Sequence, residues 1–214
     1  MTLVVRAIVR VSDVERAVSD DLVPIRAGRV AALASLRADP PVATEPELRQ
    51  HDAITRAVHE AAPSLPSRFG EVFADDGALA SALRSREDSL NAQLENIGDR
   101  VELVVTLRWR EPRPHLAAPT NDTGRAYLEA RGVRAREKRE AEQVVARLVE
   151  QLPVERAFIR HRSCPRDGVA AIVAILSARD EVSTLRQHIG SYGERSSDTD
   201  VDIYGPLPPY SFVS

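Results

Sequence analysis

Two histidines and an aspartate in one stretch of the chain are the first residues whose types could carry chemistry. His51, Asp52 and His59 lie between Thr44 and Ala62, a segment that we predict to be a helix. Imidazole and carboxylate groups can hold a metal ion or transfer a proton. An eight-residue step turns about 80° around a helix, so the two histidines do not share a face. We therefore interpret them as ordinary polar positions of the helix and not as a ligand pair.

A serine and an arginine stand next to each other in segment 65–73, Leu-Pro-Ser-Arg-Phe-Gly-Glu-Val-Phe. Ser67 is not in the Gly-x-Ser-x-Gly pattern of a nucleophile, and no histidine or acid is placed by the sequence to activate it. Arg68 is surrounded by apolar residues and would need a carboxylate or carbonyl partner if it were buried. We interpret Arg68 as a structural bridge, with substrate binding as the alternative.

The remaining candidates for chemistry are a lone thiol and scattered glycines. Cys164 is the single cysteine, which excludes an internal disulfide, and it lies in Cys-Pro-Arg-Asp-Gly, a turn-like segment. Gly124 and Gly132 do not form a phosphate-binding loop. We expect no catalytic residues, no metal and no cofactor.

The bulk composition is that of a globular protein. Among 214 residues, 29 basic and 32 acidic side chains leave a net charge of -3, which argues against a nucleic-acid partner. Arg6 and Arg10 interrupt the apolar N-terminus, which we interpret as a strand and not as a signal peptide. No apolar run approaches the length that spans a membrane, so we expect a cytoplasmic protein without a membrane partner.

Hydrophobic periodicity predicts the elements that position these residues. An alternating or apolar β-branched pattern indicates strands, and apolar residues at three- and four-residue steps indicate helices. Thr44 with Glu47 forms a capping-box pattern, and Ala27-Gly28 a hairpin signal. In the first half we predict strands at 3–11, 22–25, 29–36, 65–73 and 101–109, and helices at 44–62 and from Asp75 or Asp76 to Gly98.

A proline-rich segment, 111–120, separates these elements from the second half and predicts a linker. Beyond it we predict helices at 121–151 and from Val182 to Gly193, and strands at 154–161, 169–176 and 201–204. The fold class is therefore α+β with two domains, residues 1–110 and 121–214. From Val101 onward the order is β-α-β-β-α-β, the ferredoxin-like arrangement, and strand 101–109 could be shared between the domains.

The end of the chain combines prolines and aromatic residues. Segment 204–213 reads Tyr-Gly-Pro-Leu-Pro-Pro-Tyr-Ser-Phe-Val in a protein with only 4% aromatic residues. The prolines predict an extended, polyproline-like arm that follows the last strand of the second domain. Two interpretations stay open, a plug that closes the protein's own core and an arm that binds a partner. If it is a plug, deletion of residues 205–214 destabilises the protein.

Two of these segments carry a family resemblance. Segment 65–73 resembles the Leu-Pro-x-Arg-Phe-Gly-x-x-Phe motif of the gas vesicle accessory family GvpF/GvpL, and the ending resembles that family's Gly-Pro-Trp-Pro-Pro-Tyr-Ser-Phe-Val. Gly124 to Leu128 is similar to its Gly-x-x-Tyr-Leu, and His51 falls where the family often has a histidine. The chain departs from the family in its first strand, which lacks Tyr-x-Tyr-Gly, and in Leu207, which replaces the tail tryptophan. From these motifs we take as candidate structural or interaction residues Pro66, Arg68, Phe69, Gly70, Phe73, Tyr127, Gly205, Pro206, Pro208, Pro209, Tyr210 and Phe212.

The resemblance implies a non-enzymatic protein needed for gas vesicle formation, with two α+β domains. It also implies association with the small hydrophobic shell protein of the GvpA type and with other accessory proteins, and it does not separate the F type from the L type. From the residues alone, two other classes of function stay open. One is a small-ligand-binding regulatory module on the ferredoxin-like domain, and the other is an enzyme pocket around His51 and Arg68.

Overall fold

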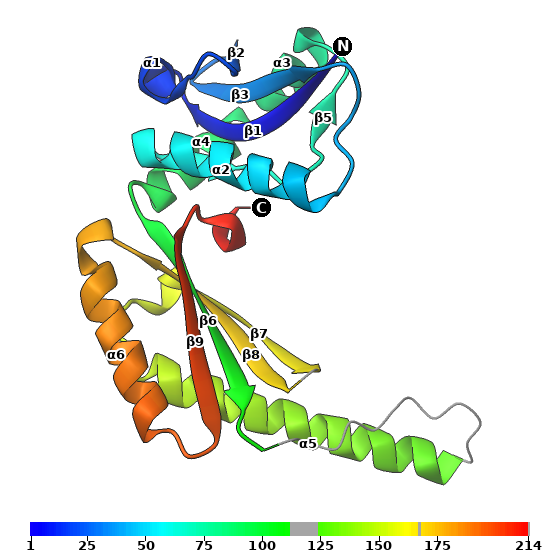
Figure 1. Cartoon of the computed structure of the whole chain (residues 1–214), viewed down its shortest axis with the longest axis vertical. Coiled ribbons are helices and arrows are strands. Elements are labelled where there is room, and N and C mark those ends of the chain that lie inside the picture. Colours follow the sequence, from blue (N-terminus) through cyan, green and yellow to red (C-terminus); the bar gives the residue numbers. More distant parts are fainter. Residues whose placement is uncertain (112–123, 167, 214) are drawn as a thin grey trace. The chain divides into compact units, whose positions relative to one another are not determined.

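The computed structural model describes residues 1–111, 124–166 and 168–213, and their side chains except those of 124–130 and 164–166. The chain divides into two compact units, Met1–Glu102 with Leu207–Ser214, and Leu103–Pro206. Each unit contains one antiparallel sheet and its own helices (Figure 1). The fold is therefore mixed α/β, as the pattern of predicted elements indicates.

The first unit is built on a sheet with the strand order β2-β3-β1-β4, in which β5 also pairs with β1. Its strands are β1 (Thr2–Arg10), β2 (Val23–Ala27), β3 (Val30–Arg37), β4 (Ser64–Pro66) and β5 (Val72–Phe73). Its helices are α1 (Val14–Ala17), α2 (Glu45–Ala61), α3 (Asp76–Ser85) and α4 (Glu87–Ile97).

Strand β3 lies between two layers of helices. Every residue from Val30 to Ser35 is buried, so both faces of the strand are covered. On one face Ala31 and Leu33 pack with Val58 of α2 and with residues of α1. Helices α3 and α4 also contact β3, and α3 contacts β2. The hydrophobic core of this unit is thus sandwiched around β3 and β1.

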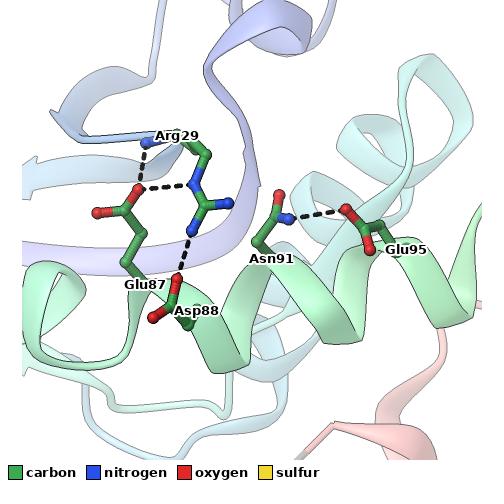
Figure 2. A network of polar contacts seen from close by, with 5 residues as sticks. All are labelled: Arg29, Glu87, Asp88, Asn91 and Glu95. Carbon is green, nitrogen blue, oxygen red and sulfur yellow. Dashed lines mark hydrogen bonds and ion pairs between the residues drawn. The ribbon is translucent and has the colours of Figure 1, made fainter.

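The β2–β3 hairpin is fastened to the start of α4 (Figure 2). Gly28 has φ +59, a conformation that favours glycine at a tight turn. Next to it, the backbone N and the Nε of Arg29 both donate to Oε1 of Glu87, at 2.9 and 3.0 Å, and Nη2 donates to Asp88. A Cβ at Gly28 would lie 2.2 Å from the Glu87 carboxylate, so a side chain here would require Glu87 to move away from Arg29.

The predicted helix from residue 75 to Gly98 is wrong, because the structure has two helices there. Asp75 caps α3 by accepting from the N of Ala78 at 2.8 Å, as expected. Arg86 then leaves the helical conformation, with φ −120 and ψ 8, and α4 starts at Glu87. The interruption places Glu87 and Asp88 in the first turn of a new helix, where carboxylates are stabilised and where they reach Arg29.

The predicted capping box at the start of α2 is also wrong. Helix α2 begins after Thr44, but the Thr44 side chain makes no capping hydrogen bond. Glu47 instead forms a two-bond ion pair with Arg37 of β3, at 2.7 and 2.8 Å. A bidentate guanidinium partner is a stronger ligand for a carboxylate than a single backbone N–H.

The second unit has a four-stranded sheet in the order β7-β8-β6-β9. Its strands are β6 (Val101–Trp109), β7 (Ile159–Arg166), β8 (Val169–Ser177) and β9 (Thr199–Leu207), and its helices are α5 (Gly124–Val149) and α6 (Val182–Arg195). The order along the chain is β-α-β-β-α-β, and this arrangement is consistent with a ferredoxin-like unit.

Both helices of this unit cover the same face of its sheet (Figure 1). Leu103, Val105 and Leu107 of β6 belong to one buried cluster with residues of α5 and of α6. The hydroxyl of Tyr192 in α6 donates to the Val144 carbonyl of α5 at 3.2 Å, which links the two helices. None of the helices in the described part of the chain is long and apolar enough to span a membrane.

Several predicted boundaries in the second half differ from the structure. Strand β7 starts at Ile159 and runs through Cys164, which is therefore in a strand and not in a turn. β7 is at the edge of its sheet and its register shifts between Ser163 and Arg166, so Pro165 is tolerated there. Helix α6 continues past Gly193 to Arg195. A Cβ at Gly193 would lie 3.1 Å from the Val201 side chain, so this glycine allows close packing on β9 and does not end the helix.

The division into units also differs from the predicted domains 1–110 and 121–214. The chain passes from the first unit to the second at Glu102, inside β6, and the tail from Leu207 belongs to the first unit. Most of the predicted linker, residues 112–120, lies outside the described residues. The proline content of a segment can be read from the sequence and suggests a linker. The contacts of a strand, which decide the unit to which its residues belong, cannot be read in this way.

Candidate functional site

The Leu-Pro-Ser-Arg-Phe-Gly motif lies at an edge of the first sheet. β4 and β5 both pair with β1, Pro66 opposite Ala7 and Val72 opposite Val4, so they act as two parts of one edge strand. Residues 67–71 leave the sheet between them, and we call this segment the edge loop. Its two ends remain hydrogen-bonded to β1, because Ser67 N donates to Arg6 O and Val5 N donates to Glu71 O, both at 3.0 Å.

Hydrogen bonds between residues of the edge loop hold its two ends together. The Ser67 hydroxyl donates to Oε2 of Glu71 at 2.7 Å, and Glu71 N donates to Arg68 O at 3.2 Å. Gly70 has φ +83, which other residues rarely adopt. Pro66 is buried in β4 at the sheet edge, where its missing N–H costs no ladder bond. The motif therefore encodes a loop of defined shape.

A buried arginine supports the loop from behind. Arg6 of β1 is 1% exposed, and its Nε donates to Ser35 Oγ at 3.1 Å. Its Nη1 lies 3.0 Å from Nδ1 of His51, and because a guanidinium can only donate, Nδ1 must be the acceptor. His51 therefore carries its proton on Nε2, which donates to Ser67 O at 3.0 Å. The chain of bonds runs from β1 through α2 to the edge loop.

The electrostatics of this network keep His51 neutral. Burial lowers the pKa of His51, and the nearby positive charge of Arg6 lowers it further. The ring of Phe69 meets the His51 ring edge-on, with centroids 5.6 Å apart. His51 is thus a positioning residue with both ring nitrogens engaged in hydrogen bonds.

The tail returns to the first unit and packs there. Pro208 and Pro209 are buried, and Tyr210–Phe212 form one 3₁₀ turn, closed by Phe212 N donating to Pro209 O at 3.1 Å. Ser211 binds Glu102 through its backbone N at 2.8 Å and its hydroxyl at 2.6 Å. Glu102 is 2% exposed, and burial raises the pKa of its carboxyl group.

The predicted extended arm is therefore corrected in two respects. Gly205, Pro206 and Leu207 still belong to strand β9, and the aromatic residues beyond them form a turn in place of an alternating strand. The tail packs on the first unit, whereas we expected it to follow the second domain. The buried carboxylate of Glu102 provides a partner for Ser211 that the local sequence does not reveal.

The edge loop, the tail and α4 together line a groove of about 440 Å³ in the first unit. Arg68 and Arg86 are exposed at it, and Leu65 and Leu90 supply buried apolar surface. The hydroxyl of Tyr210 is buried without a hydrogen-bond partner among the described residues, and burial raises its pKa. The full lining is Ile8, Leu65, Pro66, Ser67, Arg68, Phe69, Gly70, Glu71, Arg86, Leu90, Tyr210 and Val213.

The predicted site residues fall into three groups. Pro66, Arg68, Phe69, Gly70 and Tyr210 meet at the groove. Phe73 in β5 and Phe212 in the tail are half-buried, and the Gly205 carbonyl accepts from Arg186. Of the three predicted prolines of the tail, Pro208 and Pro209 are buried and Pro206 is exposed. The side chain of Tyr127 in α5 lies outside the described residues.

Arg68 is not the buried structural bridge that we predicted. Its side chain is exposed, and the buried arginine of this region is Arg6. Sequence reasoning also missed Glu102 and Ser211. An arginine between the apolar residues Val5 and Ala7 of β1 was the available signal for Arg6, whereas Glu102 follows the alternating pattern of a solvent-facing residue.

The histidine pair is also explained by packing. His59 is 2% exposed, with Nδ1 3.1 Å from Ser64 Oγ and Nε2 3.0 Å from Arg100 O. It is therefore a buried hydrogen-bonding residue, as His51 is. The described residues contain no group of three or more His, Cys, Asp or Glu side chains that could hold a metal ion.

Two solved structures share the whole fold. The gas vesicle protein GvpF from Microcystis aeruginosa matches with a TM-score of 0.77, and GvpF from Anabaena sp. PCC7120 matches with 0.71, both at 13% identity. Each match covers 100% of this chain, with 99% and 98% of the respective solved chain. The two α/β units thus have the architecture of a GvpF protein.

Sequence comparison assigns the family. A family model described as gas vesicle synthesis protein GvpL/GvpF matches residues 8–214. Gas vesicle protein F of Streptomyces sp. (strain CB03234) is 28% identical over 218 residues, covering 92% of this chain and 90% of that protein. The chain belongs to the GvpL/GvpF family of gas vesicle proteins, which is not a known enzyme family.

Proposed function

We propose that this protein is a non-enzymatic accessory protein of gas vesicle assembly, which acts in the cytoplasm and binds the small shell protein and other accessory proteins at the groove. One observation carries the proposal. The two family motifs are far apart in the sequence, yet Arg68 and Phe69 of one and Tyr210 of the other line the same groove. Motifs that converge on a surface groove are typical of a binding site.

The chemistry of the groove supports a protein partner. A shell subunit with a face destined to meet gas exposes apolar surface before assembly, and such surface aggregates unless a partner covers it. The groove offers apolar side chains, among them Leu65, Leu90 and Val213, together with the cations Arg68 and Arg86. An apolar floor with a polar rim is the usual anatomy of a protein interface.

Two alternatives receive less support. A pocket of the second unit holds only about 150 Å³, below the range of about 300–1,000 Å³ usual for small-molecule sites. Its cations are engaged, because Arg147 pairs with Asp198 at 2.8 Å and Arg195 donates to Gln151 at 2.9 Å. The enzyme alternative needs His51 and Arg68 in one pocket, and His51 does not line the groove.

Co-expression with the small shell protein of a gas vesicle system tests the proposal. The tagged full chain should retain the shell protein in a low-salt pull-down, and Val213→Lys, at the groove, should reduce that retention strongly. Val42→Lys is the matched control, because Val42 is 71% exposed and does not line the groove. Equal thermal unfolding of both variants establishes that each is folded. No retention by the folded parent protein would sink the proposal, and equal loss in both variants would remove the groove from it.

A further inference from the structure

Arg68 forms no ion pair with a carboxylate of the described residues, in contrast to several other arginines of the first unit. Six arginines of this unit form ion pairs: Arg16 with Asp13, Arg26 with Glu15, Arg29 with Glu87 and Asp88, Arg37 with Glu47, Arg49 with Glu45, and Arg56 with Asp52. Acidic partners are therefore available over much of this surface, and none of the described ones pairs with Arg68.

The nearest acid in the sequence is used for another purpose. Glu71 is three positions after Arg68, but its carboxylate accepts from the Ser67 hydroxyl at 2.7 Å and closes the edge loop. The Arg68 guanidinium therefore lies at the groove without an ion pair to any carboxylate of the described residues. Arg86 of the α3–α4 junction lines the same groove, so cations outnumber acids in its lining.

The groove combines this charge with apolar surface. Phe69 follows Arg68 directly and is held edge-on against His51, and Leu90 and Val213 also line the groove. A guanidinium binds a carboxylate through two parallel N–H bonds, which a neutral amide cannot reproduce. The complementary occupant has a carboxylate and an aliphatic side chain close together.

We propose that the groove recognises a short segment of a partner protein in which an Asp or Glu adjoins aliphatic residues, with its carboxylate on Arg68. This inference rests on the proposed function, because it names the chemistry of the segment that docks at the same groove. The guanidinium selects the acidic residue, and Phe69, Leu90 and Val213 pack against the aliphatic neighbours.

Two blocked tripeptides test the inference by NMR titration of the ¹⁵N-labelled full chain. The probes are Leu-Glu-Leu and Leu-Gln-Leu, which differ only in charge. The parent protein should bind the Glu peptide about tenfold more tightly, the ratio expected for a charge-assisted hydrogen-bond pair. Arg68→Gln should abolish this preference, and Arg84→Gln should keep it, because Arg84 is exposed on α3 and does not line the groove. Equal binding of both peptides, binding of neither, or a preference that survives Arg68→Gln would overturn the inference.

The shell-protein pull-down separates this inference from the proposed function. If Arg68→Gln retains the shell protein like the parent while Val213→Lys loses it, the groove is the docking site and its acid selectivity is refuted. If the parent does not retain the shell protein but prefers the Glu peptide through Arg68, the groove has the proposed chemistry and serves a different protein.

Discussion

Ser211 donates hydrogen bonds to both carboxylate oxygens of Glu102, although the two residues are 109 positions apart in the sequence. The backbone N of Ser211 donates to Oε2 at 2.8 Å, and its hydroxyl donates to Oε1 at 2.6 Å. Glu102 is 2% exposed, so water cannot replace a missing bond at low cost. This pair fixes the tail to the first unit and thereby holds Tyr210 and Val213 at the groove.

Ser211→Ala should lower the free energy of unfolding by about 1.5–3 kcal/mol, the range for a hydrogen bond to a charged group. Alanine keeps the backbone bond to Glu102 and removes only the hydroxyl bond. Urea unfolding followed by circular dichroism measures the change. Ser85→Ala is the control, since the Ser85 hydroxyl bonds the Ala82 carbonyl at an exposed site, and a change in Ser211→Ala no larger than in this control would contradict the prediction.

Glu102→Gln should change how stability depends on pH. Burial raises the pKa of Glu102 above its ordinary value of 4.5, so above that pH the unfolded chain ionises first. The stability that protonated Glu102 contributes is therefore fully present below pH 4.5 and is lost as pH rises through the folded-state pKa. Glutamine cannot ionise. The difference in free energy of unfolding between Glu102→Gln and the parent should therefore shift in favour of Glu102→Gln as pH rises from 4.5 towards neutrality. A difference that stays constant over this interval would contradict the assignment.

His51 should give a pH dependence of the opposite sign. Burial lowers its pKa below 6.5, so the unfolded chain binds a proton first as pH falls. The stability contribution of neutral His51 is present above pH 6.5 and is lost as pH falls through the folded-state pKa. His51→Asn retains an acceptor for Arg6 and should not show this loss in chemical denaturation measured across the same interval.

His51→Leu should be much less stable than His51→Asn. Leucine leaves Nη1 of the buried Arg6 without its acceptor, at a cost of roughly 1.5–3 kcal/mol. Both variants lose the bond from Nε2 to Ser67 O, so the loss of that bond does not contribute to their difference. Leucine is the more apolar residue and the better helix former, so a lower stability of His51→Leu would point to the Arg6 contact. Equal midpoints in urea for the two variants would show that Arg6 finds another partner.

Gly28→Ala should destabilise the first unit more than Gly70→Ala does. Both glycines have positive φ, at +59 and +83, so both changes force an L-residue into a left-handed conformation at about 1–2 kcal/mol. Only at Gly28 does the new Cβ meet another group, the Glu87 carboxylate, and displace it from Arg29. Thermal unfolding compares the two variants. The excess loss in Gly28→Ala should disappear in a Glu87→Ala background, and its persistence there would refute the steric explanation.

Features that depend on near neighbours could be predicted from the sequence. The hairpin around Gly28, the start of α2 after Thr44 and the β-α-β-β-α-β order of the second half follow from turn residues and hydrophobic period, and the structure contains all three. A hydrophobic stripe does not show a break of one residue, so the interruption at Arg86 was missed although the stripe from Leu79 to Leu94 is buried as expected.

Features that depend on distant partners could not be predicted. Glu47 has the spacing of a capping-box residue, but Arg37 competes for its carboxylate. Arg6 and Arg68 both have apolar neighbours in the sequence, and only Arg6 is buried, where it bonds Ser35 and His51, both distant from it in the sequence. The family motifs identified the loop and the tail as important, whereas their meeting at one groove required the pairing of β4 and β5 with β1 and of Ser211 with Glu102.

Because the tail belongs to the first unit, that unit can be completed only after nearly the whole chain has been synthesised. The first unit consists of Met1–Glu102 and Leu207–Ser214, with all of Leu103–Pro206 between them in the sequence. During translation the early residues leave the ribosome long before Tyr210 and Val213 are synthesised. The groove therefore lacks these two lining residues until the second unit has been synthesised. Nascent chains consequently lack a finished groove, so the docking that we propose would require a chain that has been synthesised through its tail.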